Sequence, residues 1–233
     1  MMDISRVIYT AITAGVDTLR GPTSPAAGWS YVCFSESDPK CPPWRWSPIQ
    51  PGALSPVRQA RDIKVNAHRY LPEAQISLWM DGNIEHRADL NDLAARLLED
   101  TDIALHAHPQ RRCLYQEAIA VLTLGKDDAE RVLPQVLKYA RESMPTEAGL
   151  YATGVLLRRH TERMADLEKR WWKEIQEGSH RDQISLPFVL RALNVKPAII
   201  DGDIWKGPIF VHRRHDGPAY AKPPQSQADA SSR

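Results

Sequence analysis

Short apolar runs along the chain predict strands, and longer runs with a helical period lie between them. Strands are expected at 6–12, 29–34, 76–80, 102–106, 152–157 and 209–211. Helices are expected where apolar positions recur every three or four residues, at 58–71, 89–100, 112–124, 127–142, 163–177 and 182–193, the last interrupted at Pro187. Strands that alternate with helices are typical of an α/β sandwich, so the predicted fold class is α/β with a single domain.

Two stretches break this alternation. Residues 37–56 are rich in proline, carry Trp44 and Trp46 and keep no regular period, so we expect a surface loop or a lid there. Residues 218–233 are dominated by Pro, Ser, Gln and Ala, which predicts a disordered tail. The predicted folded domain therefore runs from residue 1 to residue 217.

Composition and charge narrow the class of protein. The 233 residues are 42% hydrophobic and 25% charged, as in ordinary soluble globular proteins. A formal net charge of +1 excludes a polyanion binder that works by bulk charge, but leaves room for a local basic face. The 3 cysteines include no Cys-x-x-Cys pair, and we find neither a signal-peptide pattern nor an apolar run of about 20 residues. We therefore expect a cytoplasmic protein without a membrane span.

The strongest candidate for metal chemistry is Asp81-Gly82-Asn83, which directly follows the predicted strand 76–80. Ligands gather at this end of the strands in open α/β sheets. Two oxygen-bearing side chains separated by one glycine can point to the same side. A hard cation such as Mg²⁺ or Mn²⁺ accepts carboxylate, amide and phosphate oxygens together. The alternative is a plain turn, which such a tripeptide forms more often.

Two basic segments are the next candidates. Residues 212–215, His-Arg-Arg-His, follow a predicted strand, so a histidine there could complete a metal site and the arginines could hold a diphosphate. A solvated basic turn is the alternative. Arg58, Arg61 and Lys64 repeat every three residues on one predicted helix and could also meet phosphate, although charge stripes are usually solvated faces.

Residues 181–183, Arg-Asp-Gln, begin a predicted helix. Asp182 and Gln183 could act as helix caps or could reach the hydroxyls or the anomeric carbon of a sugar. His106 and His108 share a strand face and could bind a metal, but no second pair of ligands has zinc-site spacing, so zinc is not favoured. Cys113 has no signature of a nucleophile.

Several of these segments, taken in order, resemble the glycosyltransferase-like family that includes the plant TOD1 and MUCI70 proteins. The resemblance spans roughly residues 6–215 and is carried by ordered segments rather than by one decisive motif. These segments are 61–64, 76–84, 108–118, 147–151, 171–175 and 179–185. That family is similar to the GT-A nucleotide-sugar transferases, especially the retaining glycogenin-like group. The resemblance therefore implies a GT-A-like fold, with a mixed, mostly parallel sheet sandwiched between helices.

The resemblance also implies roles for particular residues. The GT-A enzymes hold Mn²⁺ with an Asp-x-Asp motif, for which this chain has Asn83 at the second position, with one negative charge fewer. A C-terminal histidine, His212 or His215, would close the metal site. Asp182 and Gln183 match the pair that contacts the transferred sugar, so they are the expected catalytic residues. The donor-binding residues expected are Thr10, Ala11, Ile12, Asp17, Arg58, Arg61, Lys64, Asp81, Gly82, Asn83 and Arg181.

The acceptor is less well defined. Glu147, His108 and Trp172 are the expected acceptor residues, and at most one of the adjacent Trp171 and Trp172 should face a cleft, because neighbours on a helix point about 100° apart. The acceptor is a glycan, a small molecule or a hydroxymethylated base in phage DNA. For DNA, phosphate contacts and stacking would come from Arg111, Arg112, Arg158, Arg159, Arg213, Arg214, Trp44 and Trp46.

The sequence thus predicts a bacterial or phage glycosyltransferase that depends on Mn²⁺ or Mg²⁺. It would move a hexosyl or pentosyl group from a nucleotide-diphosphate donor, UDP-linked by preference, to a hydroxyl acceptor, with retention favoured over inversion. The alternative is a catalytically silent module that binds a nucleotide sugar, which the asparagine at position 83 motivates. The enzyme hypothesis requires the Asp81 turn and the C-terminal histidines to meet in space.

Overall fold

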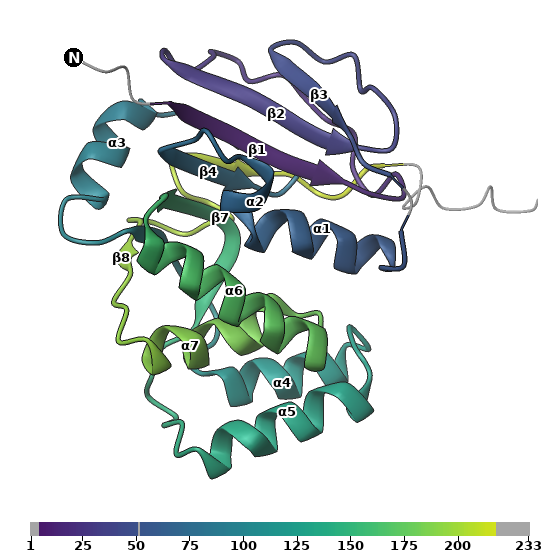
Figure 1. Ribbon diagram of the computed structural model, residues 1–233, viewed down its shortest axis with the longest axis vertical. Coiled ribbons are helices and arrows are strands. Elements are labelled where there is room, and N and C mark those ends of the chain that lie inside the picture. The colour runs from purple at the N-terminus through teal and green to yellow at the C-terminus, as the bar shows by residue number, and fades with distance from the viewer. Residues whose placement is uncertain (1–4, 51, 218–233) are drawn as a thin grey trace, which may run out of the picture.

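A computed structural model of the chain describes residues 5–50 and 52–217 (Figure 1). In this part of the chain, a seven-stranded sheet has the strand order β3-β2-β1-β4-β7-β6-β8. Its strands are β1 (Arg6–Ile12), β2 (Trp29–Ser35), β3 (Trp44–Pro48), β4 (Ile76–Met80), β6 (Ile103–Ala107), β7 (Tyr151–Arg159) and β8 (Ala198–Ile199). A smaller sheet pairs β5 (Ile84–His86) with β9 (Phe210–His212).

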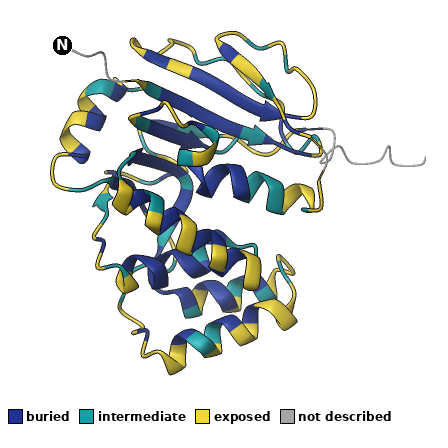
Figure 2. Ribbon diagram, in the orientation of Figure 1, coloured by how far each residue is buried: buried dark blue, intermediate teal, exposed yellow. Residues whose placement is uncertain are grey.

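Helices cover both faces of the main sheet. They are α1 (Pro56–Val65), α2 (Ala67–Tyr70), α3 (Leu90–Leu97), α4 (Leu114–Thr123), α5 (Ala129–Arg141), α6 (Glu162–Glu177) and α7 (Asp182–Ala192). Alternate residues of β1 serve the two faces, because successive strand side chains point to opposite sides. Val7 and Tyr9 pack with α1 and α4–α7, whereas Ile8 packs with α3 and the small sheet. Figure 2 shows the central strands and the inward helix faces as buried.

The sheet is mixed and mostly parallel. β1 runs parallel to β2 and β4, β2 to β3, and β6 to β8, whereas β7 is antiparallel to β4 and β6. The prediction of an α/β fold with a mixed, mostly parallel sheet between helices is confirmed. Because β1 and β4 are parallel neighbours, their carboxyl ends meet at one edge, and the first residues of β7 lie at that edge too.

The predicted loop at 37–56 is partly wrong. Trp44–Pro48 forms β3, the edge strand of the sheet beside β2, and Trp44 is buried against Tyr31. An edge strand needs hydrogen bonds on one side only, so it tolerates the prolines that hid it in the sequence. The predicted tail at 218–233 lies outside the described residues.

Two helix predictions also need correction. The helix expected at 58–71 is divided at Asn66 into α1 and α2, and the Asn66 side chain there donates to Asp62 Oδ1 at 2.6 Å. The interruption expected at Pro187 does not occur, because α7 continues through it. Proline lacks only its own N–H, so one helical hydrogen bond is lost while the apolar face of α7 stays packed.

Candidate active site

A cleft of about 620 Å³ opens at the sheet edge where β1 and β4 end. It is also lined by the start of β7, the beginning of α7, one face of α1 and the C-terminal segment. The cleft gathers many residues that the sequence singled out: Ala11, Asp17, Arg61, Lys64, Asp81, Gly82, His108, Arg181, Asp182, Gln183, His212 and His215. Segments more than 100 residues apart in the chain therefore contribute to one concave surface.

Asp81 stands at the corner between β4 and β7. Its side chain is 35% exposed, so the carboxylate faces the cleft rather than a dry interior. The Trp79 indole donates to Asp81 Oδ1 at 2.7 Å, and the Asp81 N–H donates to the Gly154 carbonyl at 2.9 Å. A Cβ at Gly154 would lie 3.3 Å from Asp81 Oδ2 and 3.0 Å from Ile84 Cδ1. Glycine at position 154 therefore keeps space beside the carboxylate.

The pairing of β5 with β9 brings the C-terminal histidines to this corner. Ile84 pairs with His212, and the Arg213 N–H donates to the Asn83 carbonyl at 2.9 Å. The Asn83 amide donates to the Arg213 carbonyl at 2.8 Å, and its Nδ2 lies 3.4 Å from His212 Nε2. The two segments whose meeting the enzyme hypothesis requires lie side by side.

The two histidines have different surroundings. Burial lowers the pKa of His212, against the attraction of Asp81 and Asp17, which favours the neutral imidazole that can bind a metal. His215 lies with its Nδ1 2.7 Å from Asp17 Oδ1, and this hydrogen bond raises the pKa of His215. Within residues 5–50 and 52–217, no group of three or more His, Cys, Asp or Glu side chains is arranged to hold a metal ion.

Lys64 is a deeply buried cation in the lining of the cleft. Its side chain is 1% exposed, and its ammonium lies 2.7 Å from Asp182 Oδ2, 3.5 Å from Asp81 Oδ1 and 5.6 Å from the centre of a Trp79 ring. Arg61 Nε lies 3.7 Å from the other Asp182 oxygen. Burial would raise the pKa of the Asp182 carboxyl, but Lys64, Arg61 and Arg181 hold it well below its usual range. Asp182 is therefore an ionised carboxylate despite its burial.

The first turn of α7 presents Asp182 and Gln183 to the cleft. Arg181 is the N-cap residue and makes no side-chain capping bond. The Gln183 amide donates to the Tyr151 carbonyl at 3.2 Å, which joins α7 to the start of β7. Burial lowers the pKa of the Arg181 guanidinium, and neighbouring Arg61 lowers it further. The cleft floor thus concentrates positive charge around one carboxylate.

The structure does not bring every predicted site residue to the cleft. Six of them are absent from its lining: Thr10, Ile12, Arg58, Asn83, Glu147 and Trp172. Arg58 donates to the Ile175 and Gly178 carbonyls, so its place in the charge stripe serves helix packing. Trp171 and Trp172 are both buried in the core, and Glu147 is exposed away from the cleft. Asn83 is 3% exposed and fixes the C-terminal segment through Arg213.

Other cleft residues were not singled out as site residues from the sequence. They are Thr13, Val16, Val57, Ala60, Trp79, Ile84, Lys126, Ala152, Thr153, Gly154, His180, Ile204 and Trp205. Two of them had a sequence signal. Gly154 interrupts an otherwise apolar strand, which marks a close approach of another group, and Trp205 stands among Asp, Gly and Pro in a loop. Arg111, which the sequence predicted only as a phosphate contact for DNA, lines the cleft as well.

Residues 44–203 match the family described as TOD1/MUCI70, glycosyltransferase-like domain. An Arabidopsis thaliana protein named "Probable hexosyltransferase MUCI70" is 29% identical over 142 residues, which cover 57% of this chain and 24% of that protein. The Arabidopsis thaliana "Alkaline ceramidase TOD1" is 24% identical over 176 residues, which cover 70% of this chain and 38% of that protein. This chain thus corresponds to only part of the length of either plant protein.

Among solved structures, mouse xyloside xylosyltransferase 1 in its apo form aligns with a TM-score of 0.45 and 12% identity, over 85% of each chain. None of the helices within the described ranges has the length and apolar character that a membrane crossing requires.

Proposed function

The chain belongs to the TOD1/MUCI70 glycosyltransferase-like family, and from that premise we propose that it is a metal-dependent glycosyltransferase with a nucleotide-diphosphate sugar as donor. One observation carries the proposal: Asp81 and His212 open onto the same cleft as the ion pair between Lys64 and Asp182. A metal-binding corner beside a cationic floor is what a diphosphate joined to a sugar requires.

The charge of the cleft supports an anionic substrate. Its lining has an excess of Lys and Arg over Asp, with four histidines in addition. The basic residues are Arg61, Lys64, Arg111, Lys126 and Arg181, and the acidic residues are Asp17, Asp81 and Asp182. A nucleoside diphosphate fits such a surface because guanidinium and ammonium groups bind phosphate oxygens strongly. We propose a UDP-linked sugar, with the loop around Asp17 at the nucleoside.

The donor atoms at the corner fit Mn²⁺ or Mg²⁺. A carboxylate from Asp81 and the imidazole of His212 are ligands that Mn²⁺ accepts, and the diphosphate itself would supply further oxygens. A site with few protein ligands can therefore bind a cation once the diphosphate is present. A bound cation would neutralise the charge that develops on the departing diphosphate. Asn83 supports this corner by fixing Arg213, the residue after His212.

The remaining chemistry belongs to groups around the sugar. The acceptor oxygen forms a bond to the anomeric carbon while the bond from that carbon to the diphosphate oxygen breaks, and the electron pair leaves with the diphosphate. The hydroxyl proton passes to the departing phosphate oxygen. Asp182 stabilises positive charge on the sugar ring, and Lys64 and Arg61 hold Asp182 in place. We propose retention, because a carboxylate with so low a pKa is a weak base for the activation of an attacking hydroxyl.

The test is a screen of nucleotide sugars with and without Mn²⁺, in which thermal stabilisation and release of free nucleotide are measured. We expect stabilisation and slow nucleotide release with one donor, both dependent on metal. Asp81→Asn and His212→Ala should lower the release rate by about 100-fold or more, a loss typical of removing a group that stabilises developing charge. Asp92→Asn, which changes an exposed acid on α3, is the matched control and should have no effect.

Two other outcomes would contradict this proposal. Metal-dependent binding of a nucleotide sugar without release or transfer across acceptors would indicate the catalytically silent module. Hydrolysis of an N-acylsphingosine, the reaction that the name of the second plant relative implies, would indicate a ceramidase. The charged lining of the cleft argues against the latter, because a ceramide presents two long apolar chains.

A further inference from the structure

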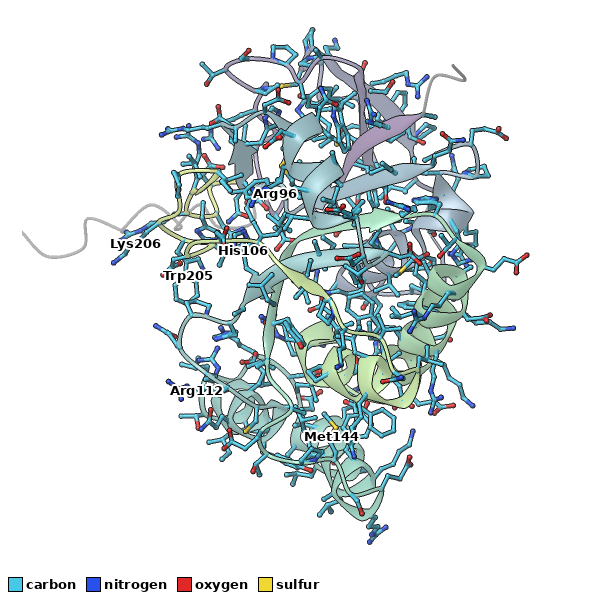
Figure 3. The ribbon with its side chains drawn as sticks, turned by 90° about the vertical axis from the view of Figure 1, so that its left-hand side faces the viewer. Arg96, His106, Arg112, Met144, Trp205 and Lys206 are labelled. Atoms are coloured by element: carbon cyan, nitrogen blue, oxygen red, sulfur yellow. The ribbon has the colours of Figure 1, made fainter. Side chains whose placement is uncertain are left out.

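One large aromatic side chain on the cleft, Trp205, has no role in the donor site. It lies on the segment between β8 and β9, lines the cleft and is 38% exposed. Its ring stands edge-on to the His108 ring, with 6.2 Å between the ring centres. Figure 3 shows Trp205 beside Lys206 on the C-terminal segment at the edge of the molecule. An indole left open to solvent on a concave surface is available to a ligand.

A tight turn fixes the backbone that carries Trp205. The Trp205 N–H donates to Asp203 Oδ1 at 2.7 Å, and the Gly207 N–H donates to the Asp203 carbonyl at 2.6 Å. Gly202 before it has a φ of 89°, a left-handed value that favours glycine. His106 Nδ1 lies 3.1 Å from the Gly202 carbonyl, which joins the turn to β6. The indole is therefore held by a braced turn rather than by a free loop.

The same segment borders the reacting corner. Ile204 is 3% exposed, and a Cβ at Gly154 would lie 3.1 Å from Ile204 Cδ1 and 3.3 Å from Asp81 Oδ2. Trp205 is the next residue, and its ring lies toward His108. Trp205 thus stands on the wall of the cleft between the Asp81 corner and His108, where a second substrate can approach the donor sugar.

The structure favours a sugar over DNA as that second substrate. Of the residues that DNA binding would use, Arg158 is fully buried and Trp44 is 9% exposed. Arg111 and Arg213 are paired with Glu117 at 2.6 Å and Glu85 at 2.8 Å. Four of the residues named for DNA are therefore buried or already held by a carboxylate, which weakens the case for contacts to successive phosphates. A sugar ring needs only hydrogen-bonding groups and a flat apolar surface for the C–H groups of one of its faces.

We propose that Trp205 forms the stacking wall of an acceptor subsite and that the acceptor is a pyranose ring of a glycan. The inference rests on the proposed transferase function, since it names the second substrate of the same cleft. His108, a residue predicted from the sequence to contact the acceptor, lies at the far end of this wall. Trp172, also expected there, is in the core, and Trp205 takes the role assigned to it.

The test uses equilibrium binding, so that it does not depend on turnover. Methyl glycosides of short β-glucose, β-xylose, β-galactose and α-mannose oligomers are titrated calorimetrically into the full chain. We expect one series to bind, Trp205→Ala to weaken it by about 10-fold, and Trp205→Phe to retain most of the affinity, as the loss of one stacking contact predicts. Trp46→Ala is the matched control, because Trp46 is 39% exposed but does not line the cleft.

The outcomes separate this inference from the function on which it rests. If nucleotide sugars are turned over but no glycoside binds, or if Trp205→Ala binds glycosides as well as the wild type, the acceptor subsite is wrong and the transferase stands. If Trp205→Ala weakens donor binding equally, Trp205 belongs to the donor site and the proposal fails. If the chain binds a single-stranded oligodeoxynucleotide but no glycoside, and Trp205→Ala weakens that binding, the glycan acceptor is wrong and DNA is indicated instead. If the wild type binds a glycoside, Trp205→Ala does not, and no nucleotide sugar is turned over, the sugar subsite is supported and the proposed transferase activity is contradicted.

Discussion

At the scale of single residues, side chains of the same type on one helix face have different roles. Arg58, Arg61 and Lys64 form one stripe in the sequence, and the pattern gives no reason to separate them. In the structure, Lys64 and Arg61 meet Asp182, whereas Arg58 binds carbonyls at the end of α6. The difference arises from elements more than 100 residues away in the chain, which no local pattern encodes. A stripe of basic residues can indicate candidate site residues, but only their contacts in the folded protein show which of them line the site.

The glycine beside Asp81 gives a first prediction. Gly154→Ala would place a Cβ 3.0 Å from Ile84 and 3.3 Å from the Asp81 carboxylate, so the carboxylate must move by a few tenths of an ångström. We expect metal-dependent nucleotide release to fall by about 10-fold or more, with about 1–3 kcal/mol of lost stability from overpacking. Gly52→Ala is the control, because no atom lies within 4 Å of its added Cβ. Unchanged turnover in Gly154→Ala would contradict this geometry.

Glu85 gives a prediction about pH. Burial would raise its pKa, but hydrogen bonds from Thr23 and Arg213 lower it from 4.5 to about 2. Because the folded-state pKa is the lower one, the ionised carboxylate stabilises the fold above about pH 4.5, and this contribution is lost as the pH falls toward 2. Glu85→Gln should cost about 1–3 kcal/mol at pH 7 and should flatten the loss of stability in that acid range. Urea unfolding at a series of pH values measures both effects, and equal pH profiles for the two proteins would disprove it.

At the scale of elements, a buried charge network holds the end of α1. Arg158 of β7 is fully buried and donates to the carbonyls of Lys64 at 2.7 Å and Val65 at 3.1 Å. It also pairs with Glu168 of α6 at 2.9 Å, and Tyr9 lies beside it. The network fixes the backbone of the residue whose side chain enters the cleft, and thus links the core to the candidate site.

This network predicts strong coupling between two residues. Arg158→Met should destabilise the protein by about 3–5 kcal/mol, because it removes the arginine from the buried Glu168 carboxylate and leaves it only the contacts with His68. The double variant Arg158→Met with Glu168→Leu should recover much of that loss, since neither charge is then buried. Denaturant unfolding of the four proteins in a double-mutant cycle measures the coupling. Additive losses would mean that the pair contributes no specific interaction.

Elements were predicted well where their period is regular and poorly where they are short. The amphipathic helices and the buried strands β1, β2, β4 and β7 follow from alternation and helical spacing alone. β5 and β8 have only 3 and 2 residues, too few to show a period, and β3 is hidden by prolines. β5 matters most for the candidate site, because its pairing with β9 carries His212 to Asp81. The resemblance to the family, rather than any local pattern, predicted that meeting.

At the scale of the whole molecule, the C-terminal segment closes the site by crossing the loop after β1. The Gly217 N–H donates to the Val16 carbonyl at 3.2 Å, and Asp216 accepts from the Thr18 N–H at 3.3 Å. His215 reaches Asp17 in the same crossing. The loop expected to hold the nucleoside and the segment expected to complete the metal site are therefore one assembly.

Because of this crossing, a single substitution should increase local opening of the C-terminal segment without unfolding the core. A Cβ on Gly217 would lie 2.1 Å from the Gly15 carbonyl oxygen, so Gly217→Ala must release the crossing. We expect amide exchange at Arg213 and Gly217 to rise and metal-dependent donor binding to fall by about 10-fold. The core strands should keep their protection. Slow exchange at Arg213 in the variant would show that the crossing does not hold the segment, and Gly52→Ala again serves as the control.

The pairing of β5 with β9 also has a consequence for folding during synthesis. The Asp81 turn leaves the ribosome about 130 residues ahead of His212. A nascent chain can thus assemble most of its large sheet while Asp81 still lacks the neighbouring His212. The candidate site would be complete only once the C-terminal segment 210–217 has emerged and paired with β5, and cleavage between β8 and β9 would separate His212 from Asp81 while the strands of the large sheet stayed paired.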